Sequence, residues 1–169
     1  HAQQQHPRRH PVIPAPFDYV RAESAEEAIS LVGQHGDEAK FIAGGHSLLP
    51  MMKLRFAQPG HLIDLGKIGE LKGIREDGGT IRIGAMTTIA DIGAAPAVRQ
   101  HFLALAEACD AFSTRQVESM GTIGGNIGNA SPAADTAPAL LAYTAEVVIA
   151  APEGERVVLL GDFFVGPGR

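Results

Sequence analysis

KFIAGGHSLLP (Lys40–Pro50) joins an apolar run of strand type to a pair of glycines and then to the start of a helix. The run is short and is stopped by Gly44 and Gly45, which is typical of a buried strand that ends in a glycine turn. Ser47 is suited to the N-cap position, and Pro50 falls in the first turn, where its missing N–H group costs little. The stretch therefore predicts a strand, a glycine loop and a helix in succession.

Strand and helix signals alternate on both sides of this stretch. Phe17–Arg21 is predicted to be a strand, and Ser24-Ala25-Glu26-Glu27 is a capping box that opens a helix ending between Gly33 and Gly36. His61–Asp64 predicts another strand. We therefore expect residues 14–65 to form an N-terminal α/β lobe.

Hairpin signals dominate the rest of the chain. Leu71–Arg75 and Thr80–Gly84 are strand candidates separated by Asp-Gly-Gly, and Ala145–Ala151 is expected to pair with Arg156–Leu160. Residues 66–169 are therefore predicted to form a larger second lobe with a mostly antiparallel sheet. The expected fold class is α/β (α+β) with two lobes.

Helical spacing of apolar residues predicts a single amphipathic helix over Pro96–Ala111. Cys109 lies on its apolar face, and a free cysteine on such a face is usually a small buried residue. A short further helix is expected near Asp135.

Composition excludes several classes of function. The basic residues are scattered and the net charge is -5, which argues against a nucleic-acid partner. No apolar run reaches the roughly 18–20 residues that a transmembrane helix needs. Cys109 is the only cysteine, so the chain cannot supply the four thiolates of an iron–sulfur cluster, and the seven histidines lack metal-ligand spacing. No metal site is therefore predicted.

The first residues have almost nothing to bury. Residues 1–13 are rich in His, Gln, Arg and Pro, so we expect a disordered leader. Arg8 and Arg9 are not followed by the apolar stretch of an export signal, which favours a cytoplasmic location.

Two glycine loops stand out from ordinary packing sequence: Ala43–Ser47 and Gly121–Asn126. Paired glycines let successive backbone N–H groups turn toward one point and form an anion-binding nest. Ser47, Thr122 and Asn126 add small polar donors. The alternative interpretation is that each glycine pair is only a tight turn. Neither loop has the Rossmann or P-loop pattern, so two such loops favour a dinucleotide bound in another way.

Four motifs in the right order carry a resemblance to a known family. They are AGGHSLLPMMKLRFAQPGHLIDL (Ala43–Leu65), IGAMTTIADI (Ile83–Ile92), GTIGGNIGNASPAAD (Gly121–Asp135) and DFFVGPGR (Asp162–Arg169). The chain resembles the FAD-binding medium subunits of aerobic carbon monoxide dehydrogenases and the xanthine dehydrogenase family. The resemblance implies the two-lobed FAD-binding fold of the vanillyl-alcohol oxidase (PCMH) type. It also implies that the second lobe is incomplete at its C-terminus, since such subunits continue beyond this point.

The resemblance also implies a set of cofactor-binding residues and no catalytic residue or metal ligand. In the family the two glycine loops hold the FAD pyrophosphate. The implied residues are Phe41, Ile42, Ala43, Gly44, Gly45, His46, Ser47, Leu48, Gly84, Ala85, Thr87, Thr88, Gly121, Thr122, Ile123, Gly124, Gly125, Asn126 and Asp135.

Several residues of these motifs keep a second interpretation. Asp135 is implied to accept a hydrogen bond from the FAD ribose, or it caps the next helix. Thr88 lies in the segment near the flavin, or it is a helix N-cap. His46 suggests covalent attachment of the flavin, but the resemblance implies noncovalent FAD. Lys53 and Arg55 lie near the phosphates or on a solvated helix face.

By resemblance, the chain relays electrons within a molybdenum hydroxylase. The implied partners are a large subunit with molybdopterin cytosine dinucleotide and a small subunit with [2Fe-2S] clusters, assembled as a dimer of heterotrimers; a peripheral position at the inner membrane, reached through the complex, stays open. This flavin would take electrons from the clusters and pass them to an external acceptor. The alternatives are a stand-alone FAD-dependent reductase or oxidase of the same fold, and a non-catalytic module that binds a phosphate ligand or supports assembly.

Overall fold

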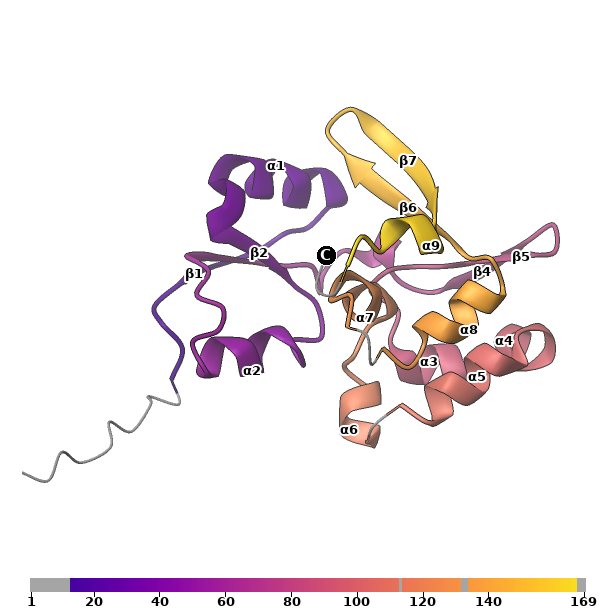
Figure 1. Cartoon of the computed structure of the whole chain (residues 1–169). Coiled ribbons are helices and arrows are strands. Elements are labelled where there is room, and N and C mark those ends of the chain that lie inside the picture. The colour runs from indigo at the N-terminus through magenta and orange to yellow at the C-terminus, as the bar shows by residue number, and fades with distance from the viewer. Residues whose placement is uncertain (1–12, 113, 132–133, 167–169) are drawn as a thin grey trace, which may run out of the picture.

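A computed structural model describes residues 13–112, 114–131 and 134–166 of the chain (Figure 1). The predicted leader lies outside these residues except for Ile13. The path of the chain divides into a smaller N-terminal part and a larger part that follows it.

A three-stranded parallel sheet forms the N-terminal part. Its elements are β1 (Asp18–Arg21), α1 (Ala25–His35), η1 (Gly36–Glu38), β2 (Ala39–Ile42), α2 (Leu48–Lys53) and β3 (His61–Asp64). The strand order is β1-β3-β2, and α1 and α2 lie on opposite faces of the sheet (Figure 1). The predicted strands and helices of this part are confirmed to within a few residues.

The ends of α1 follow from its sequence. The Ser24 hydroxyl accepts from the Glu27 amide at 3.1 Å, and the Glu27 carboxylate accepts from the Glu23 amide at 2.8 Å. This is the predicted capping box with one difference: the Glu27 carboxylate accepts from the amide of Glu23, the residue before the N-cap, and not from the amide of Ser24. Gly36 ends the helix with a φ of 54°, a conformation that glycine adopts without strain.

Two hairpins and a group of short helices form the larger part. The elements are η2 (Gly69–Leu71), β4 (Ile74–Asp77), β5 (Thr80–Ile83), α3 (Ile89–Ala94), α4 (Pro96–His101), α5 (Leu103–Asp110), α6 (Arg115–Glu118), α7 (Ile123–Gly128), α8 (Ala137–Ala142), β6 (Glu146–Ala151), β7 (Gly154–Leu159) and α9 (Leu160–Phe163). Both predicted hairpins are confirmed, since β4 pairs with β5 and β6 pairs with β7 in antiparallel register.

The prediction of one helix over Pro96–Ala111 is wrong, because the helix breaks at Phe102. Phe102 has φ -134° and ψ 53°, so α4 ends before it and α5 begins after it. Tyr143, at the end of α8, packs edge-on against the Phe102 ring and its hydroxyl accepts from the Ala104 amide at 3.2 Å. A residue far along the chain therefore satisfies a first-turn amide of α5. The apolar face is as expected, and Cys109 is buried.

Two hydrophobic clusters hold the chain together. The smaller one joins α1 to the parallel sheet through Ala22, Ala28, Ala39, Ile63 and Ile68. The larger one is built from helices α3–α5 and α7–α9, with the β4–β5 and β6–β7 hairpins packed against it, and includes Ile92, Leu105, Leu140 and Leu160. Two clusters fit two lobes, although the exact division at residues 65 and 66 stays a prediction. No helix in the described ranges is long and apolar enough to cross a membrane.

Candidate cofactor-binding site

The first glycine loop leaves the carboxyl edge of the parallel sheet. Ile42, the last residue of β2, stands opposite Asp64, the last residue of β3, and the loop follows at once. Ligands of open α/β sheets commonly bind outside this edge of the strands. Gly45 has a φ of +75°, which reverses the chain into α2 and which other residues rarely adopt.

Four consecutive amides of this loop are free to bind a ligand. Within the described part of the chain, the N–H groups of Gly44, Gly45, His46 and Ser47 donate to no protein acceptor. Gly44 and Gly45 are half-buried, while His46 and Ser47 are exposed. Backbone N–H groups next to a left-handed glycine are the donors of an anion-binding nest. The first loop therefore has the donor set that a phosphate requires.

The second glycine loop uses its amides differently. The Ile123 amide donates to the Thr87 carbonyl at 3.1 Å, and the Gly124 amide donates to the Ala85 carbonyl at 2.8 Å. In the opposite direction, the Ile89 amide donates to the Gly121 carbonyl at 2.9 Å. The Gly125 amide donates to the Thr122 hydroxyl at 3.2 Å, which caps α7. The loop follows a short helix, α6. It is therefore fastened to segment 85–89 and is not a second nest of free amides.

The glycines of both loops allow close contact between backbones. A Cβ atom on Gly44 would stand 2.1 Å from the Met120 carbonyl oxygen, so the two loops touch at a point where no side chain fits. A Cβ atom on Gly124 would stand 2.7 Å from the Ala85 Cβ and 2.8 Å from its carbonyl oxygen. Paired glycines here are thus more than tight turns, and they set the distance between the parts of the site.

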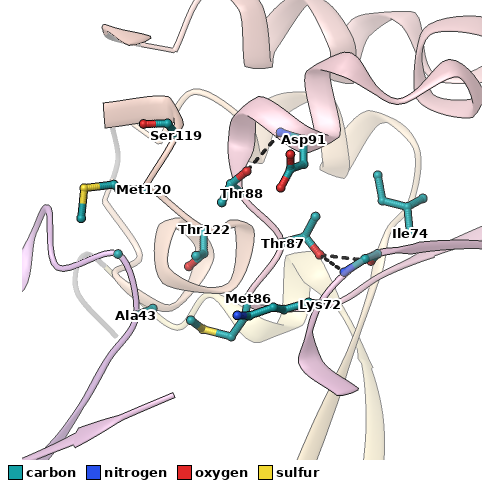
Figure 2. A pocket seen from close by; sticks show the side chains of 12 residues that line it. Ala43, Lys72, Ile74, Met86, Thr87, Thr88, Asp91, Ser119, Met120 and Thr122 are labelled. Carbon is teal, nitrogen blue, oxygen red and sulfur yellow. Dashed lines mark hydrogen bonds between the residues drawn. The ribbon is translucent and has the colours of Figure 1, made fainter. Parts of the chain in front are cut away.

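A cavity of about 490 Å³ lies where the two loops meet (Figure 2). This volume is within the range of roughly 300–1,000 Å³ that is usual for small-molecule and cofactor sites. Its lining comes from four segments: Ala43, Gly44, Lys72, Gly73, Ile74, Met86, Thr87, Thr88, Asp91, Ser119, Met120 and Thr122. The structure therefore brings both loops and the segment near the predicted flavin into one cavity.

The two threonines of that segment have different tasks. The Thr87 hydroxyl accepts from the Gly73 amide at 2.9 Å and donates to the Gly73 carbonyl at 3.1 Å, so it is committed to that turn. The Thr88 hydroxyl accepts from the Asp91 amide at 3.1 Å as the N-cap of α3. The N-cap interpretation of Thr88 is thus confirmed, and its hydroxyl hydrogen stays available to the cavity.

Other predicted residues lie away from this cavity. The Asn126 side chain accepts from the Thr136 hydroxyl at 2.6 Å and links the second loop to α8, a task that the sequence did not indicate. Asp135 is exposed, and Thr136 occupies the N-cap of α8. Ser47 occupies the N-cap of α2 but makes no side-chain cap hydrogen bond. The binding roles of these residues, and of the others that do not line the cavity, stay predictions.

A polar network supports the base of the first loop. The Asp64 carboxylate accepts from the Tyr19 hydroxyl, from Arg21 Nε at 3.0 Å and from the Gly66 amide at 2.7 Å. Burial acts to raise the pKa of Asp64, but these hydrogen bonds outweigh it and lower the pKa overall. Asp64 therefore stays ionised at the edge of the sheet from which the loop leaves.

The fold and the site define a class of protein. A parallel α/β unit, a loop of free amides at its carboxyl edge and a cavity shared with a second, partly antiparallel part are the features of a domain that binds a phosphate-bearing cofactor between two lobes. The family described as "FAD binding domain in molybdopterin dehydrogenase" matches residues 15–169. The chain belongs to this family of FAD-binding domains, which have the PCMH-type fold.

Similar proteins agree with this assignment. The carbon monoxide dehydrogenase medium chain of Hydrogenophaga pseudoflava is 48% identical over 155 residues, which are 92% of this chain and 54% of that protein. The glyceraldehyde dehydrogenase medium chain of Sulfolobus acidocaldarius is 38% identical over 92% of this chain and 55% of its own length. A solved structure of the carbon monoxide dehydrogenase from Hydrogenophaga pseudoflava superposes with a TM-score of 0.91, at 48% identity, over 93% of this chain and 55% of that chain. The chain thus spans about half the length of the relatives that it matches.

Proposed function

We propose that the chain holds FAD noncovalently and relays electrons as the flavoprotein component of a molybdenum-containing hydroxylase or dehydrogenase. The observation that carries the proposal is the set of four free amides at Gly44–Ser47 beside a cavity that the second loop completes. Flavin supplies the electron chemistry when it is bound, and the protein supplies binding, orientation and electrostatics.

The residues present fit the pyrophosphate of such a cofactor. The amides of the first loop would hold phosphate oxygens, and a hydrogen bond to a charged group contributes about 1.5–3 kcal/mol. Thr122 lines the same cavity, and its hydroxyl would add a donor from the second loop. Gly44 and Gly45 themselves carry no side chain that could stand between their amides and a phosphate. His46 is exposed, and we propose that it forms no covalent bond to the flavin.

The rest of the proposed complex lies in other chains. We propose a large subunit that binds molybdopterin cytosine dinucleotide, a small subunit with [2Fe-2S] clusters, and a dimer of heterotrimers. The names of the relatives, which are medium chains of dehydrogenases, support the presence of a large and a small partner subunit. We also propose a cytoplasmic location for the complex and an external acceptor that receives the electrons from the flavin.

Two experiments test the cofactor. The visible absorption spectrum of the purified full chain should show flavin bands, and a colourless protein that binds no added FAD would contradict the proposal and favour a phosphate-ligand or assembly module. Acid precipitation should then release the flavin into the supernatant. Flavin that stays in the pellet would show covalent attachment and direct attention to His46.

A third experiment separates an electron relay from a stand-alone enzyme. The isolated chain should not oxidise carbon monoxide, aldehydes or purines with a dye acceptor, whereas it should co-elute with its partner subunits on size exclusion. Turnover by the isolated chain would favour the stand-alone oxidase or reductase.

A further inference from the structure

Lys72 is held firmly at the cavity by its neighbours in the chain. The Met86 amide donates to the Leu71 carbonyl at 2.7 Å, and the Gly84 amide donates to the Gly73 carbonyl at 2.9 Å. A Cβ atom on Gly84 would stand 2.3 Å from the Leu71 carbonyl oxygen, so the two segments are in backbone contact. Both residues that flank Lys72 are therefore fixed, and its side chain starts from a preorganised position.

The Lys72 side chain points across the cavity. Figure 2 shows it extending past Met86 toward Ala43 of the first loop. Its Nζ atom donates to the Gly66 carbonyl at 2.6 Å, and an ammonium group has two further hydrogens to offer. The network at Asp64 binds the Gly66 amide and so holds the partner of Lys72 as well.

Charge gives Lys72 a particular task. Among the described residues that line the cavity it is the only cation, and Asp91 is the only acid. The whole chain carries a net charge of -5, and a cofactor with a pyrophosphate is itself anionic. Without Lys72 the lining would be negative, which would oppose binding of an anion.

We propose that Lys72 supplies the positive charge of this site and binds a phosphate oxygen of the dinucleotide together with the free amides of the first loop. This inference rests on the proposed binding of FAD. Lys72 is then a binding residue that selects for a phosphate-bearing flavin, and the amides of the first loop and the ammonium group act on the same anion.

The test is a titration of the full apo chain with FAD, followed by flavin fluorescence, at several salt concentrations. Lys72→Met should bind FAD about tenfold more weakly at low salt, because one charge-assisted hydrogen bond is lost. The difference should shrink as salt rises, since salt screens the attraction that only the wild type has. Lys72→Arg keeps the charge and should keep the salt dependence.

The matched control is Lys67→Met. Lys67 lies nearby in the chain, but it pairs with Glu23 at 3.7 Å and does not line the cavity. The FAD affinity of Lys67→Met should therefore differ from that of wild type by less than about twofold. Equal affinity of Lys72→Met and wild type, or a loss that is the same at every salt concentration, would overturn the proposal. If wild-type protein bound no FAD at all, the proposed function itself would fail, which is a separate result.

Discussion

The first glycine loop leaves four consecutive amides without a protein acceptor among the described residues, whereas the second uses its amides to fasten itself to segment 85–89 and to close its own helix. The same sequence feature, a pair of glycines, thus leaves free donors in one place and serves packing in the other. The two loops touch where Gly44 meets the Met120 carbonyl. The second loop, which is held in place by segment 85–89, therefore positions the first loop and its free amides.

The largest effect should come from the point of contact. In Gly44→Ala the new methyl group would stand 2.1 Å from the Met120 carbonyl oxygen, so one backbone must move. We expect a loss of about 3 kcal/mol in the free energy of unfolding and a loss in FAD affinity on the order of 100-fold. Denaturant unfolding and FAD titration measure the two quantities.

Gly128→Ala is the matched control for this change. Gly128 lies in α7, has an ordinary φ, and has no other atom within 4 Å of the place that a new methyl group would take. Its substitution should leave FAD affinity unchanged and raise stability by about 0.5–1 kcal/mol. If Gly44→Ala behaved like Gly128→Ala, the two loops would not depend on their close contact.

The next substitutions separate the two tasks. Gly45→Ala puts a side chain on a residue with φ +75°, which costs about 1–2 kcal/mol and turns the free amides away from their common point. Gly124→Ala crowds Ala85 at 2.7 Å and should cost about 1–3 kcal/mol by overpacking.

For each variant, the loss in the free energy of FAD binding is compared with the loss in the free energy of unfolding. The distinction between the two loops depends on the ratio of these two losses. Gly45→Ala should lose more free energy of FAD binding than of unfolding, and Gly124→Ala should show the reverse. Equal ratios for the two variants would mean that both loops contribute to FAD binding and to stability in the same proportion. The distinction between free amides in the first loop and packing contacts in the second would then be wrong.

A smaller effect should distinguish the two hydroxyl groups. Thr122→Ala removes the cap bond to the Gly125 amide and should cost about 1 kcal/mol of stability. Ser47 makes no side-chain cap bond, so Ser47→Ala should leave the free energy of unfolding nearly unchanged. Thermal unfolding of the two variants checks this. An equal destabilisation would show that Ser47 caps α2 after all.

Local pattern was enough to predict most of the fold. The capping box at Ser24 and the turns of both hairpins are local features, and the strands around Ile42 and Ile63 are marked by local apolar runs. All of them were predicted to within a few residues. The break at Phe102 was not predictable in this way, because the residue that packs on Phe102 and accepts from the Ala104 amide, Tyr143, lies 41 positions further along the chain than Phe102. Helical periodicity continues through the break and hides it.

The site was predictable where glycines mark it and not where backbone contacts build it. The sequence indicates the glycines at 44 and 124 but not that they meet Met120 and Ala85. Lys72 was missed, because a lysine inside a predicted strand, Leu71–Arg75, resembles any exposed strand residue. Only the contacts at Leu71 and Gly73 place it on the cavity.

The smallest effect we expect is the pH dependence that Asp64 contributes, and it concerns the base of the first loop alone. Its pKa in the folded protein is below the value in the unfolded chain, because the hydrogen bonds from Tyr19, Gly66 and Arg21 outweigh burial. The stability that Asp64 contributes is therefore fully present above the unfolded value of about 3.9 and is lost as pH falls through the folded value.

Asp64→Asn should thus be less stable than wild type by a constant amount between about pH 5 and pH 7, and the difference should shrink in acid. Arg21 is half exposed, so the effect should be smaller than that of Thr122→Ala. Urea unfolding of both proteins from neutral pH down into acid measures the difference. A difference that persisted unchanged into strong acid would mean that the ionised carboxylate does not hold this edge of the sheet, and the free amides of the first loop would need another support.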